Sequence, residues 1–271
     1  MPFGLKIAPS LFQKAMIKIF EPILPNALVY IDDILLFSKD IDSHTAQLTK
    51  FHKIVQQYGV MLSEKKMAIG ETEIDFLGMH ISKEEYYFQP YIATQLDEFP
   101  DEELSFKQVQ QFFGIVNYMS EFIHALAKHI SILSAQLKKN APPWDQKYIE
   151  AVKKLKTISK TLLALKIPSK RKQILQTDAS DSYWRAVLLE EDEKGKRHIC
   201  GYKSGVFKDS EKHYHSTYKE ILAVKRGIKK TEFLMVSHHF LIEMDMSSFP
   251  KMTHKHNYLG GRVGFHNGSL M

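Results

Sequence analysis

The 271-residue sequence has little of several things, and each shortage narrows what the protein can be. It contains one cysteine, Cys200, so an intramolecular disulfide is impossible and a reducing compartment is the simplest expectation. It has no run of eighteen apolar residues, so we expect no transmembrane helix and no membrane partner. The N-terminus lacks a basic segment followed by a long apolar stretch, which argues against a secretory signal. These shortages favour an intracellular protein whose compartment is unknown.

The composition is that of a folded protein with real apolar cores. Hydrophobic residues make up 44% and charged residues 25% of the chain, and the length suits one large or two modest domains. The formal net charge is +6, and the pI is near 9.1. This balance suits a polyanionic partner such as nucleic acid, but a solvated lysine-rich surface explains it equally well. The thirteen histidines show no spacing typical of a metal site.

Two short apolar runs, Leu28–Ile31 and Ile34–Phe37, are separated only by Asp32 and Asp33. This pattern predicts a β-hairpin with both acids at its apex. Because both faces of both strands are apolar, we expect the hairpin to be buried except at its tip. Adjacent carboxylates repel each other and magnesium relieves that repulsion, so the apex is a candidate site for phosphoryl transfer. On composition alone, a solvated Asp-Asp turn is the stronger interpretation.

The periodicity changes along the chain and predicts two kinds of architecture. A helix from Ser43 is expected to end at Gly59, and a second begins at Ser105. Beyond about Lys170, three strands, one long helix and a strand ending at Asp245 predict a mixed sheet with a crossover. The other expected elements are strands over 61–63 and 74–81, helices over 148–163 and 211–230, and strands over 174–177, 184–189, 198–207 and 239–244.

Four motifs in order resemble the palm of reverse transcriptases, and the closest wording is that of plant pararetroviruses (the caulimovirus group), then gypsy-type retrotransposons. The motifs are Pro2-Phe3-Gly4-Leu5-Lys6, Tyr30-Ile31-Asp32-Asp33, Leu62-Ser63 with Lys65-Lys66, and Phe76-Leu77-Gly78. The resemblance implies RNA-directed DNA synthesis from deoxynucleotides on a primer-template, with Mg²⁺ as cofactor. It implies that Asp32 and Asp33 form the metal-binding acidic pair, that Phe3 and Gly4 line the nucleotide pocket, that Lys66 lies near the phosphates, and that Phe76, Leu77 and Gly78 hold the primer end. Without the resemblance, the simplest interpretation of Phe3 is a core aromatic residue, and that of Lys66 is a solvated lysine.

A second resemblance covers the C-terminal part. Thr177-Asp178-Ala179-Ser180, the segment His213–Ser216 and the helix around Glu220 are similar to the ribonuclease H domain of the same polyproteins. The resemblance implies that Asp178, Glu220 and Asp245 bind Mg²⁺ and cleave RNA in an RNA–DNA hybrid. By spacing alone, Glu220 is more simply half of a surface ion pair, and the two aspartates are strand-end caps. Between the domains, Phe112, Gly114 and Tyr118 resemble the family's connecting helix.

We therefore expect an α+β fold with a partial palm and a helical connection before a ribonuclease H-like mixed α/β domain. We expect the partial palm over residues 1–90 and the mainly helical thumb or connection over 91–167. The incomplete ribonuclease H-like domain is expected over 168–250, with its boundary near Pro168. Residues 251–271 are expected to form a poorly ordered tail. The cytoplasm or a virus-like particle is the expected location.

The sequence also departs from the family. The family's first palm carboxylate lies upstream of Pro2, and its fourth ribonuclease H carboxylate has no counterpart after Ser247, so we expect a copy truncated at both ends and no polymerase activity from this chain alone. Met246 stands where a polar residue is usual. Arg185 stands where a glycine is usual, and burying it would cost several kcal/mol unless it is paired. One rival interpretation is a catalytically inactive remnant that at most binds nucleic acid; another is a product that does not fold stably because its palm strands are uncovered.

Overall fold

The computed structural model describes residues 7–235, 240–244 and 263–267, the last of these as a strand only. The chain forms two compact units, Met1–Phe76 and Leu77–Met271. The mixed helical and stranded architecture agrees with the α+β class expected from the sequence. Among the described residues, no helix is both long enough and apolar enough to cross a lipid bilayer.

Unit 1 packs two helices against a two-stranded hairpin. Its small core gathers around Phe20, whose ring stacks on Phe51 with centroids 5.5 Å apart. Asp40 caps the second helix by accepting a hydrogen bond from the Ser43 amide, and Gly59 ends it in the left-handed conformation. The elements are α1 (Ala8–Phe20), a 3₁₀ turn (Glu21–Asn26), β1 (Ala27–Tyr30), β2 (Asp33–Leu36), α2 (Ile41–Tyr58), a 3₁₀ turn (Glu64–Lys66) and β3 (Glu73–Phe76).

Several expectations for this region are wrong in detail. The hairpin turn is Ile31–Asp32, and Tyr30 pairs with Asp33, so the bend lies one residue earlier than predicted. The hairpin is not buried on both faces, because Leu28 is 48% and Tyr30 is 52% exposed. The helix begins before Ser43, which is its third residue, because Asp40 supplies the cap. Residues 61–63 form no strand, and residues 74–81 form two strands around a turn at Leu77–Gly78.

Unit 2 begins with a small antiparallel sheet and a helical cluster. The sheet has the order β4-β5-β6, and the helices pack around Phe112 and Leu155. Ser105 caps α4 through a reciprocal bond with Gln108, as the sequence predicts. The elements are β4 (Met79–Ser82), β5 (Glu85–Phe88), α3 (Pro90–Asp97), α4 (Phe106–Tyr118), α5 (Leu126–Ile130), a 3₁₀ turn (Leu133–Leu137), α6 (Gln146–Ser159) and β6 (Leu165–Lys166).

The second part of unit 2 is a five-stranded mixed sheet with the order β11-β10-β7-β8-β9. In this sheet β8 pairs antiparallel with both β7 and β9. After the helical crossover, β10 pairs parallel with β7, as predicted. Within the segment 251–271, for which we expected little order, Val263–Asn267 forms β11. The strands are β7 (Lys172–Ala179), β8 (Tyr183–Glu191), β9 (Arg197–Val206), β10 (Phe240–Met244) and β11 (Val263–Asn267).

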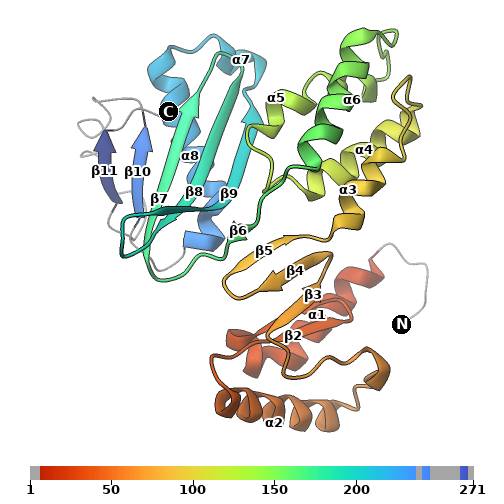
Figure 1. Cartoon of the computed structure of the whole chain (residues 1–271), viewed down its shortest axis with the longest axis vertical. Coiled ribbons are helices and arrows are strands. Elements are labelled where there is room, and N and C mark those ends of the chain that lie inside the picture. Colours follow the sequence, from red (N-terminus) through yellow and green to blue (C-terminus); the bar gives the residue numbers. More distant parts are fainter. Residues whose placement is uncertain (1–6, 236–239, 245–262, 268–271) are drawn as a thin grey trace. The chain divides into compact units, whose positions relative to one another are not determined.

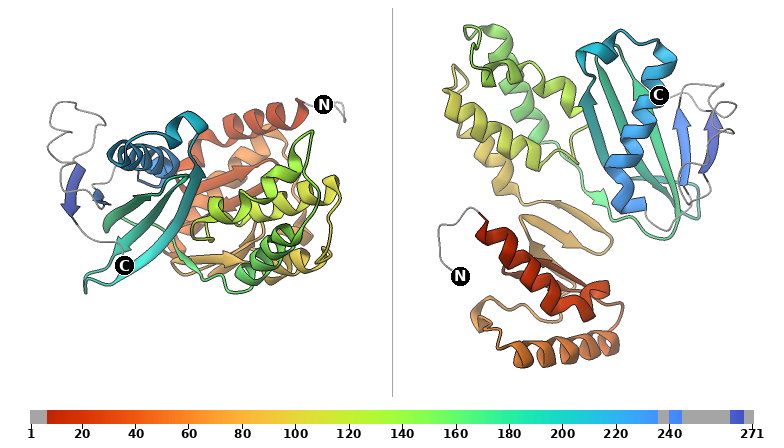
Figure 2. Two further views of the ribbon diagram at one scale, coloured as in Figure 1. Left: turned by 90° about the horizontal axis from the view of Figure 1, so that it is seen from above. Right: turned by 180° about the vertical axis from the view of Figure 1, so that it is seen from behind.

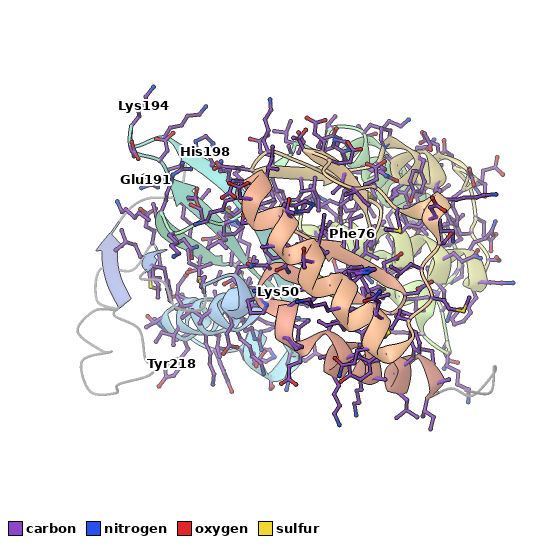
Figure 3. All side chains as sticks on the ribbon, turned by 90° about the horizontal axis from the view of Figure 1, so that it is seen from below. Lys50, Phe76, Glu191, Lys194, His198 and Tyr218 are labelled. Atoms are coloured by element: carbon purple, nitrogen blue, oxygen red, sulfur yellow. The ribbon has the colours of Figure 1, made fainter. Side chains whose placement is uncertain are left out.

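One helix, α8 (Ser216–Met235), lies across a face of this sheet (Figure 1, Figure 2). It approaches β7 and β8 most closely at Gly227, where an added Cβ would lie 3.1 Å from the Ala186 Cβ and 3.2 Å from the Thr177 Cγ2. The single helix predicted over 211–230 is instead a short α7 (Asp209–Lys212), a break, and α8. Tyr218 is 64% exposed on the outer side of α8 (Figure 3).

The helical cluster before Pro168 and the sheet after it pack together along β9. The Tyr202 amide donates to the Glu121 carbonyl at 2.8 Å, and the Ala127 amide donates to Ser204 Oγ at 2.9 Å. Lys203 pairs with the Glu121 carboxylate. Residues 77–271 therefore form one unit around two neighbouring cores.

Candidate functional site

The two acids of unit 1 stand at the tip of the β1–β2 hairpin, and both side chains are exposed. The bend is made by Ile31 with a φ of 52°, a left-handed conformation that a β-branched residue rarely adopts. The side chain of Gln13 on α1 holds the bend: its Nε2 donates to the Val29 carbonyl at 2.8 Å, and its Oε1 accepts from the Ile31 amide. The hairpin thus presents Asp32 and Asp33 to solvent on a strained, clamped turn.

The other residues implied for the polymerase site lie on separate elements. Lys66 is exposed in a 3₁₀ turn, and Phe76 is half-buried at the end of β3. Leu77 and Gly78 form the next turn, with φ of 49° and 72°. Phe3 and Gly4 lie outside the described residues.

The Leu77–Gly78 turn is held by Tyr118, the last residue of α4. The Tyr118 hydroxyl donates to the Leu77 carbonyl, and the Tyr118 ring lies 5.4 Å from that of Phe88. A Cβ on Gly78 would lie 2.8 Å from the Tyr118 hydroxyl and 3.1 Å from Ile92. At position 78, the left-handed backbone would strain a side chain, which would also crowd Tyr118 and Ile92. The sequence marked Tyr118 as part of a motif but gave no signal of this contact.

In unit 2, two of the three acids implied for the ribonuclease H site stand on elements that pack against each other, β7 and α8. Asp178 lies near the end of β7, and Glu220 lies on the first turns of α8. Glu220 shares a helix face with Ala223 and Gly227, which are turned toward the sheet. Its Oε1 accepts a hydrogen bond of 3.2 Å from the amide of Ala179, the neighbour of Asp178. Asp245 lies outside the described residues.

The carboxylate of Asp178 already has a cationic partner. Asp178 and Arg185 are directly opposite each other on β7 and β8, and Arg185 Nε lies 2.8 Å from Asp178 Oδ2. The two side chains are 29% and 39% exposed. Arg185 is thus neither buried nor unpaired, so the expected penalty for burying it does not arise.

A histidine that the sequence did not single out belongs to the same neighbourhood. Burial lowers the pKa of His124, and the positive charge of Arg185 lowers it further. The negative charge of Asp178 acts in the opposite direction and raises that pKa. The His124 ring packs edge-on against Tyr202 of β9, with centroids 5.4 Å apart. Its position comes from the segment between α4 and α5, which lies against β9, and no local pattern predicts it.

The donor set suits a divalent cation. Carboxylate oxygens are the preferred ligands of Mg²⁺ and similar hard ions, and the guanidinium of Arg185 shows that a cation is accepted at Asp178 Oδ2. Within the described part of the chain, no three His, Cys, Asp or Glu residues lie close enough to hold a metal ion. Asp178 and Glu220 stay candidate ligands for such an ion.

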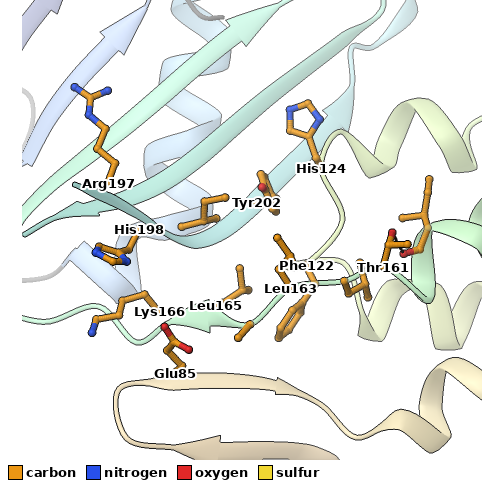
Figure 4. Close-up of a pocket in the computed structure, with 14 residues that line it drawn as sticks. Glu85, Phe122, His124, Thr161, Leu163, Leu165, Lys166, Arg197, His198 and Tyr202 are labelled. Atoms are coloured by element: carbon orange, nitrogen blue, oxygen red, sulfur yellow. Dashed lines mark hydrogen bonds between the residues drawn. The ribbon is translucent and has the colours of Figure 1, made fainter.

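A cavity of about 370 Å³ lies elsewhere in unit 2, between β9 and the segment that follows α6 (Figure 4). Its walls are largely apolar, and Phe122, Leu165 and Ile199 are among them. Two of its polar lining residues have partners. Lys166 pairs with Glu84, and His198 Nε2 lies 3.1 Å from Asp192 Oδ2. Neither Asp178 nor Glu220 lines this cavity, so we place no catalytic chemistry there.

Comparison with protein families divides the chain in two. Residues 1–81 match the family described as reverse transcriptase (RNA-dependent DNA polymerase). Residues 144–242 match an RNase H-like domain found in reverse transcriptase. Both families depend in general on divalent metal ions.

Curated relatives extend the match over nearly the whole chain. The genome polyprotein of Petunia vein clearing virus (isolate Shepherd) is 58% identical over 252 residues, which are 93% of this chain and 12% of that polyprotein. The enzymatic polyprotein of Cauliflower mosaic virus (strain D/H) is 37% identical over 266 residues, 96% of this chain and 39% of that polyprotein. The chain thus spans a minor part of the length of these relatives.

Solved structures show the same fold. A foamy viral protease–reverse transcriptase dRH in complex with double-stranded DNA aligns with a TM-score of 0.80 and 18% identity, covering 100% of this chain and 50% of that one. The foamy viral protein in complex with an RNA/DNA hybrid aligns with a TM-score of 0.79 and 18% identity, covering 100% and 39% of the two chains.

Proposed function

Since this chain belongs to the pararetrovirus polyprotein family and corresponds to its reverse transcriptase–ribonuclease H region, we propose that its C-terminal part hydrolyses the RNA strand of an RNA–DNA hybrid. The observation that carries the proposal is the contact between Glu220 and the backbone beside Asp178. Through this contact, a helix and a strand that are far apart in the sequence meet beside Asp178.

In this proposal, Asp178, Glu220 and Asp245 hold Mg²⁺. When bound, the metal supplies an activated water and stabilises the charge that develops on the leaving oxygen. The protein contributes rigid placement. Asp178 is fixed within the β7–β8 ladder, and α8 is seated on the sheet at Gly227. The Ala179 amide orients Glu220 by donating to one of its oxygens.

For unit 1, we propose the family's nucleotidyl-transfer role. Asp32 and Asp33 would hold Mg²⁺ at the hairpin tip, with Phe3, Gly4 and Lys66 toward the deoxynucleotide. Phe76, Leu77 and Gly78 would contact the primer end of the primer-template. Support comes from the exposed acids on the clamped hairpin of unit 1. Two adjacent carboxylates alone are a weak two-metal site, so we expect no primer extension by the 271-residue chain alone.

A second candidate function is binding of nucleic acid without cleavage. The observation that favours it is the ion pair between Arg185 and Asp178, which gives one of the proposed metal ligands another partner. The formal net charge of +6 suits a polyanion in either case.

A cleavage assay separates the two functions. We expect the 271-residue chain with Mg²⁺ to cut the labelled RNA of an RNA–DNA hybrid, and we expect EDTA or Asp178→Asn to abolish the cutting. Asp181→Asn is the matched control, because Asp181 is an exposed acid close by in the sequence that pairs with Lys219 at 3.0 Å. Salt-sensitive binding of the hybrid without any cutting would contradict the hydrolase and support the binding remnant.

A further inference from the structure

The side chain of Arg185 occupies a cation position within the proposed metal site. Its Nε lies 2.8 Å from Asp178 Oδ2, within hydrogen-bonding distance. The two residues are directly opposite each other in the β7–β8 register, so the contact follows from the backbone pairing and needs no loop to form it. The same register places the backbones of Arg185 and Asp178 opposite each other in every folded molecule.

We propose that Arg185 is an internal competitor of the divalent ion at Asp178 and so sets the metal concentration that the site requires. A metal ion and a guanidinium both need the carboxylate's lone pairs and its negative charge. While the ion pair is closed, Oδ2 is engaged and the charge of Asp178 is neutralised. This inference rests on the proposed metal-dependent function, which it deepens by naming a residue that tunes it.

The competition is reversible, because the ion pair is only partly shielded from water. With 29% and 39% of the two side chains exposed, solvent screens their attraction, and the arginine can turn outward without leaving a charge buried. A divalent ion carries twice the charge and also draws on Glu220. Arg185 therefore weakens metal binding without abolishing it.

A second cross-strand ion pair provides the control. Lys172 and Glu191 are also directly opposite each other on β7 and β8, with Nζ 2.7 Å from Oε1. Lys172 lies six residues before Asp178 on the same strand, a separation of roughly 20 Å. Lys172→Gln removes the same charge from the same sheet at a distance from the site.

The test is the affinity of the 271-residue chain for Mn²⁺, measured from the electron paramagnetic resonance signal of the free ion. We expect Arg185→Gln to bind about tenfold more tightly than the native chain, equivalent to about 1.4 kcal/mol. Arg185→Lys, which keeps the charge, and Lys172→Gln should bind as the native chain does. In the Arg185→Gln background, Asp178→Asn should remove the gain.

The outcomes separate this inference from the proposed function. Unchanged affinity in Arg185→Gln would overturn the inference, and if Asp178→Asn still weakened binding, the proposed metal site would stand. If Asp178→Asn left Mn²⁺ binding unchanged in both backgrounds, or if neither background bound the ion, both would fail. The tryptophan fluorescence of each variant checks that the sheet is folded, since Trp184 is buried on β8.

Discussion

The two units carry acids of similar proposed chemistry on very different supports. The hairpin of unit 1 rests on one small cluster around Phe20, and roughly half of the exposed large apolar side chains of the described chain lie in this unit, although it is under a third of the length. Asp178 and Glu220 stand on a sheet and a helix that bury an extensive core. Asp178 and Glu220 therefore have rigid support within unit 2. Unit 1, in contrast, leaves apolar surface that other protein segments could cover.

The largest expected effect tests the independence of the two cores. Phe20→Ala removes a fully buried ring that stacks on Phe51, so unit 1 should lose about 3–5 kcal/mol. Both tryptophans, Trp144 and Trp184, lie in unit 2 and report on it alone. In urea, far-UV circular dichroism should gain an early transition while the fluorescence transition keeps its midpoint.

Phe12→Ala is the control, because that ring is 40% exposed on α1. A shift of the fluorescence midpoint in Phe20→Ala, in step with the circular dichroism, would show that the two units unfold as one and would break the comparison.

A second prediction tests the tight packing of unit 2. A Cβ on Gly205 would lie 2.5 Å from the indole nitrogen of Trp184, so Gly205→Ala must displace a buried ring and should destabilise unit 2 by about 3 kcal/mol. Gly201 lies on the same strand with nothing within 4 Å of its added Cβ. Gly201→Ala should therefore leave the fluorescence midpoint in urea nearly unchanged, and equal effects of the two variants would refute the packing argument.

The smallest expected effect concerns the turn implied as the primer grip. Tyr118→Phe removes the hydroxyl that donates to the Leu77 carbonyl, so the turn should lose about 1 kcal/mol. Hydrogen exchange followed by mass spectrometry should show faster exchange of the peptide that covers the Leu77–Gly78 turn, with the sheet of β7–β9 unaffected. Tyr91→Phe, at a 51% exposed ring, should change neither. Unaltered exchange in Tyr118→Phe would mean that the turn needs no such support.

The sequence predicts those features that depend on local pattern or on family motifs. The α+β class, the caps at Ser105 and Gly59, and the crossover from β9 through α8 to β10 follow from residues close together in the chain. That Glu220 lies close to Asp178 stays a prediction from the resemblance, and the observed contact is with the Ala179 amide. Spacing alone cannot say which face of a helix meets a sheet.

Other features depend on contacts between distant segments and were missed for that reason. The burial expected for the β1–β2 hairpin is wrong. Apolar residues in a strand indicate that burial would be favourable, but they do not identify a segment that packs against the strand. Arg185 was noticed as a departure, but its partner depends on the strand register. The contacts of Tyr118 with Leu77 and of His124 with Tyr202 span 41 and 78 residues of sequence.

The most direct test of the account is to follow the backbone amide signals of the chain by NMR as Mn²⁺ is added, because the ion broadens signals near its binding site. The account predicts that the signals of Ala179 and Glu220 broaden at the lowest concentrations, ahead of those of Asp32 and Asp33. Broadening that begins at the hairpin, or that spreads evenly over the basic and acidic surface, would contradict it.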